Sequence, residues 1–523
     1  MTGLGQLVRA YLRRDRWLLV WWTLGITVLY YSQAASVKGL YATQAEFDRA
    51  AASMDDNPAL VAMAGPARAL NTVGGQVTWQ ASAFGAICIA LMCMFLVGRH
   101  TRAEEESGRD ELLRAAAVGR TAPLAAAAVV SALASLLVGA CVALSLVAVP
   151  LAGADSWALG LGLTATGWAF TGIAMVAAQL TSGVRAMYGL TGAVVGAAYL
   201  LRAIGDVGSP LLTWISPIGW YQGMHAFSGL RWWPIALLVT LALLTGAASY
   251  AVFARRDYGS GVLGVRPGPA RGSGALTTPL GLAWHQHRGS VVGWTLGMAV
   301  AGLAYGSLGT DVGDMLGDSG ATTDVFVRGG GDLVDGFYAT SIVMLGLICA
   351  GFAVSSALRP RTEEDDGRVE GLLATALTRR AWLAAHVTMT VLGTVAVVLA
   401  AGLGLGTGYA LSADDAGAVG RFTLATLPMV APVLVLAAFT RLLYGVLPRA
   451  ATLGWLALGF AVAVLFFGPL LDLPTWVQDV SPFQHLALTP VEDFRWTPLL
   501  GLLLVATLLS FGGQWGFRRR DLR

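Results

Sequence analysis

The sequence is poor in charge. Asp, Glu, Lys and Arg make up 12% of its 523 residues, about half the ~25% that is typical of soluble domains. Uncharged apolar runs of about twenty residues recur along the chain, which is the length needed to cross ~30 Å of hydrocarbon. Because these runs do not alternate with polar residues, they exclude the strands of a membrane barrel. The sequence therefore predicts an all-α polytopic membrane protein.

Lysine is almost absent, since Lys38 is its single occurrence. A P-loop needs a Gly-Lys-Ser/Thr ending whose lysine contacts the nucleotide phosphates, and no such ending is present. Any ATP that powers this chain, with its Mg²⁺, must therefore bind to another subunit. The four cysteines all fall within apolar runs, which predicts neither disulfides nor a metal site. A net charge of only +3 gives no indication of a nucleic-acid partner.

A charged segment occurs twice between apolar runs, at residues 102–120 and 361–379. At a fixed offset the two copies share an Arg-x-Glu-Glu-x-x-Gly-Arg-x-Glu-x-Leu pattern. The matching pairs are Glu104/Glu363, Glu105/Glu364, Gly108/Gly367, Arg109/Arg368, Glu111/Glu370 and Leu113/Leu372. A charged element used twice in a chain so poor in charge indicates a duplicated function.

Other features repeat in the same order along the chain. Trp-Thr-Leu-Gly occurs at 22–25 and 294–297, and a Phe-x-Arg-Arg-Asp sequence at 253–257 and 517–521. We interpret the chain as two homologous halves of six transmembrane helices, residues 1–257 and 280–523, joined by a Gly/Pro-rich cytoplasmic linker at 258–279. Arginine clusters fall on one side of this twelve-span topology, which predicts that both termini are cytoplasmic.

The first residues predict a separate surface element. Apolar side chains at helical spacing between residues 4 and 16 oppose three arginines, Arg9, Arg13 and Arg16. This pattern is typical of an amphipathic helix that lies on the membrane surface. The first span is expected to follow it, at about 17–35.

The charged segments themselves suggest a docking element. Glu105 precedes Arg109 by four residues, and Glu364 precedes Arg368 by four, an order that supports a helix. The glycine before each arginine allows a sharp turn into that helix, whose leucines give it an apolar edge. The alternative, a solvated loop that was duplicated with the rest of the chain, stays open at this point.

The Glu-x-x-x-Gly-x-x-Glu-x-Leu motif after the second of six spans resembles the membrane subunits of type-2 ABC exporters. The two-half form, with Ser-Pro-x-Gly-Trp before the sixth span, is similar to actinobacterial permeases that export polyketide antibiotics of the tetronasin type. The resemblance implies a cell-membrane permease without catalytic residues, which exports amphipathic or hydrophobic drug-like compounds and is powered by two copies of a separate ATPase. It further implies that the twelve duplicated residues contact the ATPase, and that outer re-entrant segments cap the substrate path at Trp214, Ser216, Pro217, Trp220, Ser481 and Pro482.

Two other classes of protein are alternatives to this interpretation. An ion-coupled secondary transporter of twelve spans usually has carboxylates or histidines in mid-membrane, whereas the spans predicted here hold almost none. A membrane enzyme needs catalytic groups gathered at one membrane face. Asp311, Asp314 and Asp318 form an acidic patch in a predicted outer loop, but no histidine lies near them in the sequence.

Overall fold

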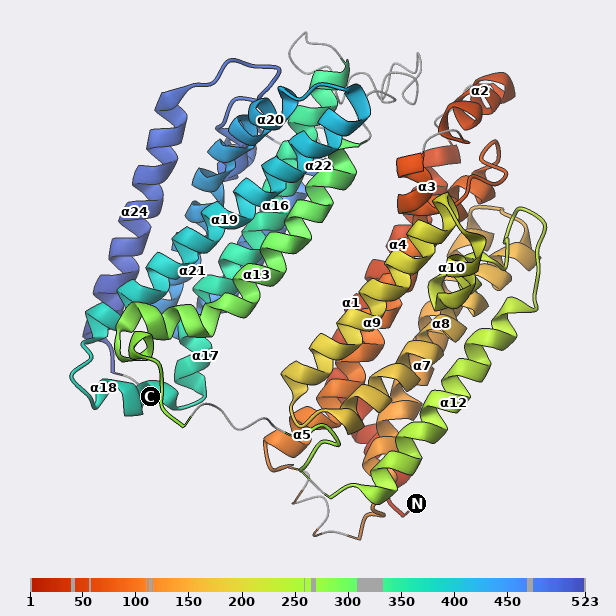
Figure 1. The fold of residues 1–523 in the computed structure, drawn as a ribbon, viewed down its shortest axis with the longest axis horizontal. Helices are drawn as coiled ribbons and strands as arrows, with labels where there is room; N and C mark the ends of the chain where they lie inside the picture. The colour runs from red at the N-terminus through yellow and green to blue at the C-terminus, as the bar shows by residue number, and fades with distance from the viewer. Residues whose placement is uncertain are drawn as a thin grey trace. The chain divides into compact units, whose positions relative to one another are not determined.

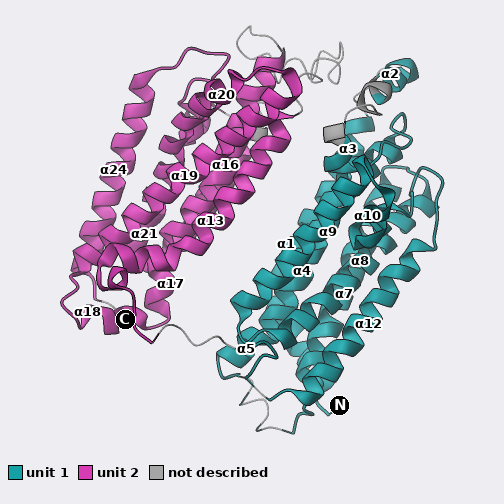
Figure 2. Ribbon diagram, in the orientation of Figure 1, with its two compact units in different colours: residues 1–268 teal, residues 269–523 magenta. Residues whose placement is uncertain are grey.

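The computed structural model describes residues 2–38, 43–55, 58–109, 111, 115, 117–257, 259–264, 270–307, 333–467 and 474–521. Within these ranges every regular element is a helix. The chain forms two compact units, residues 1–268 and 269–523 (Figures 1 and 2). The acidic patch predicted around 311–318 lies outside the described residues.

Unit 1 is organised around two helices that are buried along most of their length, α4 and α8. Thr72 begins α4 by accepting a hydrogen bond from the Gly75 amide, which satisfies one of the free N–H groups of the first turn. The long helices described in this unit are α1 (Leu4–Lys38), α4 (Val73–His100), α7 (Ala122–Ala148), α8 (Gly153–Leu180), α9 (Val184–Val207) and α12 (Pro234–Arg255). The short ones are α2 (Gln44–Asp55), α3 (Pro58–Ala64), α5 (Arg102–Glu106), α10 (Pro210–Ile215) and α11 (Pro217–Gln222).

Unit 2 is organised around a buried helix of its own, α16 (Leu333–Ala357). Its other long helices are α13 (Pro279–Gly306), α19 (Arg379–Ala413), α20 (Ala418–Thr426) continued by α21 (Val430–Val446), α22 (Gly454–Phe467) and α24 (Trp496–Arg519). The short elements are η1 (Gly274–Thr277), α17 (Arg359–Asp365), α18 (Arg368–Leu373), η2 (Leu427–Met429), η3 (Pro448–Leu453), α23 (Thr475–Gln478) and η4 (Pro482–Gln484).

Among the described residues, eleven helical segments are long and apolar enough to cross a membrane. Helix α1 is not one of them, since Trp and Tyr interrupt the aliphatic residues of its apolar part. The sequence predicted a surface helix at 4–16 and a distinct first span. The structure corrects that division, since α1 runs unbroken from Leu4 to Lys38.

Helices α13 and α19 approach each other more closely than any side chain would allow. A Cβ atom added at Gly404 would lie 2.2 Å from the carbonyl oxygen of Ala299, and one added at Gly306 would lie 2.0 Å from that of Leu405. Gly302 and Gly408 make equivalent backbone contacts. Small residues of this kind allow membrane helices to pack backbone to backbone.

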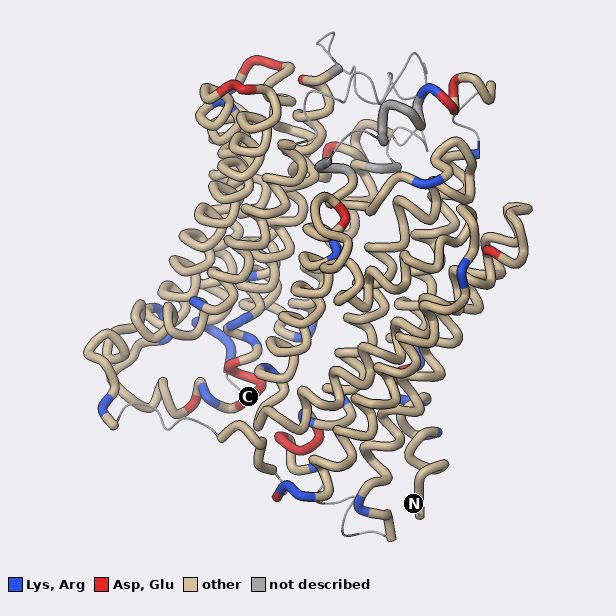
Figure 3. The backbone as a smooth tube through the Cα atoms, turned by 45° about the vertical axis from the view of Figure 1, so that its right-hand side comes forward, with Lys and Arg blue, Asp and Glu red and all other residues tan. Residues whose placement is uncertain are grey.

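Charged residues are rare along the middle of the helices and more frequent towards their ends (Figure 3). In unit 1 the start of α1, helix α5 and the end of α12 share one end of the unit, which we call its charged end. In unit 2 the charged end consists of the start of α13, helices α17 and α18, and the end of α24.

Candidate functional site

In unit 1 the charged segment is held by Glu105. Its carboxylate accepts hydrogen bonds from Arg102 Nη1 at 2.7 Å and from Arg256 Nη2 at 2.5 Å. Arg102 is fully buried and also donates to the main-chain oxygens of Ala178 and Ser260. Charge-assisted bonds of this kind are stronger than neutral ones. They attach α5 to the ends of α8 and α12.

In unit 2 the corresponding glutamate, Glu364, is also bonded to the arginine that follows the last helix. Arg520 donates two hydrogen bonds to this carboxylate, at 2.7 and 2.5 Å, and the Tyr444 hydroxyl donates a third at 2.7 Å. Arg520 stands in the repeated Phe-x-Arg-Arg-Asp sequence where Arg256 stands in unit 1.

The match between the units extends to a pair of arginines at the end of the charged segments. Arg120 donates to the main-chain oxygen of Arg256 at 3.3 Å, and Arg379 donates to that of Arg520 at 2.8 Å. Each charged segment is therefore tied to the end of its unit's last helix at two points.

The preceding glutamate is also buried in each unit and faces the first long helix. Glu104 accepts from Arg14 of α1 at 2.5 Å. Glu363 accepts from Gln286 of α13 at 3.1 Å and also pairs with Arg359. These contacts join the charged segment to α1 in unit 1 and to α13 in unit 2.

Between helix and turn, Gly108 and Gly367 adopt φ angles of +70° and +69°. The expected sharp turn at both glycines is confirmed, and residues with a Cβ rarely adopt this region. The helix that this Glu-to-Arg order favours does not continue across the glycine, because the turn interrupts it there. Arg109 instead faces Glu104 at 3.7 Å, and Arg368 pairs with Glu363 at 2.7 Å.

Beyond the turn, one glutamate is exposed in each segment, Glu111 in unit 1 and Glu370 in unit 2. In α18 the apolar edge packs inward, since Val369 is buried in a cluster with Trp382 and Phe517 and Leu372 contacts that cluster. Leu113, the equivalent of Leu372, lies outside the described residues. Of the twelve predicted docking residues, the four paired glutamates serve the internal structure of their units. The solvent-facing set is Arg109, Glu111, Arg368 and Glu370 with the two glycines.

Unit 1 has a further buried charge cluster beside Arg14. The carboxylate of Asp15 is 1% exposed and lies 2.5 Å from His100 Nε2 and 3.0 Å from Arg99 Nε. The Tyr11 ring stacks on His100 with 3.9 Å between ring centroids. The start of α1 and the end of α4 are therefore held together by an ion pair and a buried hydrogen bond.

The Ser-Pro of unit 1 marks a break between two short helices at the opposite end of the unit. Ser216 Oγ accepts from the amides of Ile218 and Gly219 and donates to the Ala198 carbonyl at 2.6 Å. Pro217 opens α11, and Trp220 Nε1 donates to the Trp214 carbonyl at 2.6 Å. This places α10 and α11 as a folded-back pair.

Unit 2 keeps the break at Ser481-Pro482 with different contacts. Pro482 opens the short helix η4 and is buried with Phe483 in the core of the unit. The Ser481 hydroxyl is buried without a hydrogen-bond partner in the described structure.

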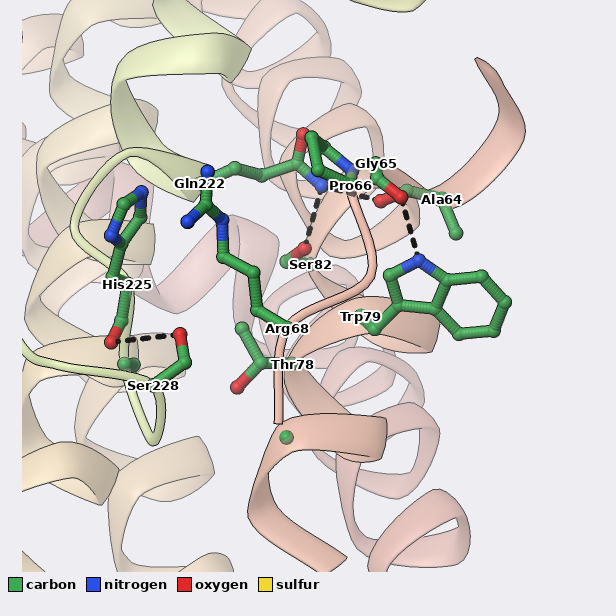
Figure 4. Close-up of a pocket in the computed structure, with 12 residues that line it drawn as sticks. Ala64, Gly65, Pro66, Arg68, Thr78, Trp79, Ser82, Gln222, His225 and Ser228 are labelled. Carbon is green, nitrogen blue, oxygen red and sulfur yellow. Dashed lines mark hydrogen bonds between the residues drawn. The ribbon is translucent and has the colours of Figure 1, made fainter. Parts of the chain in front are cut away.

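A small polar pocket lies beside α11 (Figure 4). Gln222 Nε2 donates to the Ala64 carbonyl at 2.6 Å and to Ser82 Oγ at 2.9 Å, which joins α11 to α3 and α4. His225 lines the same pocket. Burial and the positive charges of Arg68 and Arg231 lower the pKa of His225 to about 4.

Sequence reasoning missed the partners of the buried glutamates, above all Arg256, Arg520, Arg14 and Tyr444. A signal was available for two of them, because the repeated Phe-x-Arg-Arg-Asp sequence contains both Arg256 and Arg520. It was interpreted only as a marker of topology.

The fold defines a helical, multi-span membrane protein whose two units each carry a charged segment after the second long helix. Residues 276–518 match the family model described as multidrug efflux system permease Rv1217c, C-terminal domain. The chain is 39% identical over 526 aligned residues to multidrug efflux system permease protein Rv1217c of Mycobacterium tuberculosis, covering 100% of this chain and 96% of that protein. The chain belongs to this family of multidrug efflux permeases, and its expected location in the cell membrane is confirmed.

Proposed function

We propose that the chain is the membrane subunit of an ATP-driven ABC exporter of amphipathic or hydrophobic drug-like compounds. A separate ATPase, which binds ATP and Mg²⁺, docks on the charged segments after α4 and α16. The observation that carries the proposal is the duplicated turn, in which a left-handed glycine presents Glu111 in unit 1 and Glu370 in unit 2 to solvent. One such surface in each unit favours two ATPase copies per chain.

The contacts of the charged segments suggest how movement would be transmitted. When the ATPases close on ATP, each pulls its charged segment. Glu105 and Glu364 pass that displacement to the last helix of the unit. Glu104 and Glu363 pass it to the first long helix. The proposed topology is twelve spans, with α1 as the first, and both termini in the cytoplasm.

The test is to purify the tagged chain in mild detergent from cells that contain its ATPase, and to measure the ATPase-to-permease ratio. We expect a ratio of two. Glu111→Ala or Glu370→Ala alone should reduce it to one, and the double variant should abolish binding. The matched control changes two exposed glutamates away from the charged segments, Glu46→Ala with Glu492→Ala, and should retain both copies.

The competing function is an ion-coupled secondary transporter. A wild-type chain that purifies without any nucleotide-binding partner, and that drives drug efflux from a proton or sodium gradient in vesicles without ATP, would favour that alternative over ours.

A further inference from the structure

The two units carry surface grooves at corresponding positions. In unit 1 a groove of about 400 Å³ lies between α7, α8 and α12. In unit 2 a groove of about 320 Å³ lies between α19, α21 and α24. Two pairs of lining residues show this correspondence. Ala128 of unit 1 and Val387 of unit 2 have the same separation in the sequence as Glu104 and Glu363. Gly246 and Ser510 have the same separation as Phe253 and Phe517.

The floors of the grooves differ in charge. The floor of the unit 1 groove contains Trp168 and, seven residues later, Met175. The floor of the unit 2 groove contains Leu434 and, seven residues later, Arg441. Arg441 thus takes the place of a methionine, and no residue that lines the unit 1 groove is charged.

Within the described ranges, no carboxylate pairs with Arg441. Its side chain is 4% exposed, and Nη1 donates to Ser510 Oγ at 2.7 Å. Nη2 is buried and has no hydrogen-bond partner within the described ranges, and none of the ion pairs found there includes Arg441. A buried, unpaired charge among membrane-spanning helices is costly and marks a functional site by default.

The groove in unit 2 becomes more polar towards the charged end. Along α24 its lining changes from Leu503 through Ser510 to Gln514, in the direction of Arg518. The other end is formed by apolar side chains such as Val391 and Leu434. Thr507 and Phe511 line the groove and are exposed, so it opens on the surface of the unit. The shape and polarity fit a molecule with an anionic head and a hydrocarbon body.

We infer that the groove of unit 2 binds an anionic phospholipid. Its phosphate lies against Arg441 and Ser510, and an acyl chain extends along Val391, Leu434 and Leu503. The phosphate supplies the negative charge that the described protein residues do not. The groove of unit 1, with Met175 in the corresponding place, has no preference for an anionic head group. This inference concerns the chain alone and does not depend on the proposed function.

The test uses the full-length chain in an uncharged detergent, without ATPase, and a phosphatidylglycerol that carries a photoreactive acyl chain. Labelled peptides are mapped and quantified. We expect labelling within 503–514 that unlabelled phosphatidylglycerol displaces and phosphatidylcholine does not. Arg441→Met should weaken this labelling about tenfold, equivalent to ~1.4 kcal/mol, whereas Arg441→Lys should retain most of it. Arg421→Met, at an exposed arginine outside the groove, is the matched control.

Three results would overturn the inference. The first is equal labelling of 503–514 in wild type and Arg441→Met. The second is equal competition by the two lipids on the wild-type chain, a measurement that remains decisive if Arg441→Met does not fold. The third is displacement of the label by an exported drug but not by phosphatidylglycerol, which would assign the groove to the cargo.

Discussion

The contacts made by the start of the first long helix differ between the two units in their chemistry. Unit 1 uses ion pairs, Arg14 with Glu104 and Arg99 with Asp15, and Asp15 also forms a hydrogen bond with His100. In the register of the repeated Trp-Thr-Leu-Gly sequence, Arg14 corresponds to Gln286 and Asp15 to His287. Unit 2 uses hydrogen bonds there instead, from Gln286 to Glu363 and between His287 and His386 at 2.9 Å.

The two charged segments therefore share their buried glutamates and their turns, whereas the residues that contact these glutamates differ. Glu104 and Glu363 are buried in both units, yet Glu104 depends on a cation from α1, while Glu363 takes its cations from Arg359 and Arg368 beside it in the sequence. Breaking equivalent contacts should therefore affect the units unequally.

The largest effect is expected at the last helices. After Arg520→Met, the partner of Glu364 that remains among those described above is the neutral Tyr444 hydroxyl. After Arg256→Met, Glu105 keeps the positively charged Arg102. Removing one partner of a buried pair costs about 3–5 kcal/mol. We expect Arg520→Met to lower the free energy of unfolding by about 4 kcal/mol and Arg256→Met by about half as much. Thermal unfolding in detergent measures both, and equal losses would contradict the comparison.

The next largest effect is expected at Asp15, where unit 1 has a buried charge and unit 2 has hydrogen bonds. Asp15→Asn leaves a buried His100 without its carboxylate and should cost about 3 kcal/mol. His287→Asn, at the corresponding position of unit 2, removes neutral hydrogen bonds and should cost about 1 kcal/mol. Denaturation of the two variants in parallel tests this ranking, and a larger loss for His287→Asn would reverse our interpretation.

The turns should respond alike. Gly108→Ala and Gly367→Ala each place a Cβ on a left-handed residue with no neighbouring atom within 4 Å, so the effect is backbone strain of about 1–2 kcal/mol. Asn tolerates this region better, and Gly108→Asn and Gly367→Asn serve as matched variants. We expect both alanine variants, but neither asparagine variant, to reduce ATPase co-purification. A response at only one turn would show that the units are not equivalent.

The smallest effect is a pH dependence caused by His225 of unit 1. Because the pKa of His225 is lowered to about 4, protonation favours the unfolded state, in which the pKa is about 6.5. The contribution of this group to stability is full above pH 6.5 and is lost as the pH falls towards 4. His225→Gln should flatten the decrease in melting temperature between pH 7 and 4.5. An unchanged pH profile would show that His225 does not cause this decrease.

Much of this architecture could be predicted from the sequence because it rests on local signals. Apolar runs indicated the long helices, and a glycine between charged residues indicated each sharp turn. The partners of the glutamates could not be predicted in this way. Arg256 lies 151 residues from Glu105, and Arg520 lies 156 residues from Glu364, so their meeting depends on how α12 and α24 pack in the folded unit.

The continuity of α1 was missed for a related reason. The change at Trp17 from a basic to an apolar exposed face predicts a change of environment, but nothing there ends a helix. Neither glycine nor proline interrupts residues 6–24, so the backbone continues through the boundary.

The glycine contacts of α13 with α19 have a mechanical consequence. Each backbone rests on the other at four glycines, with no side chains between them that could change rotamer and absorb a displacement. Along these contacts the two helices therefore move as one rigid unit that resists bending and separation. A displacement that reaches these contacts would be carried along them with little loss. Bending must take place elsewhere, for example near His287 and His386, where side chains lie between the two helices.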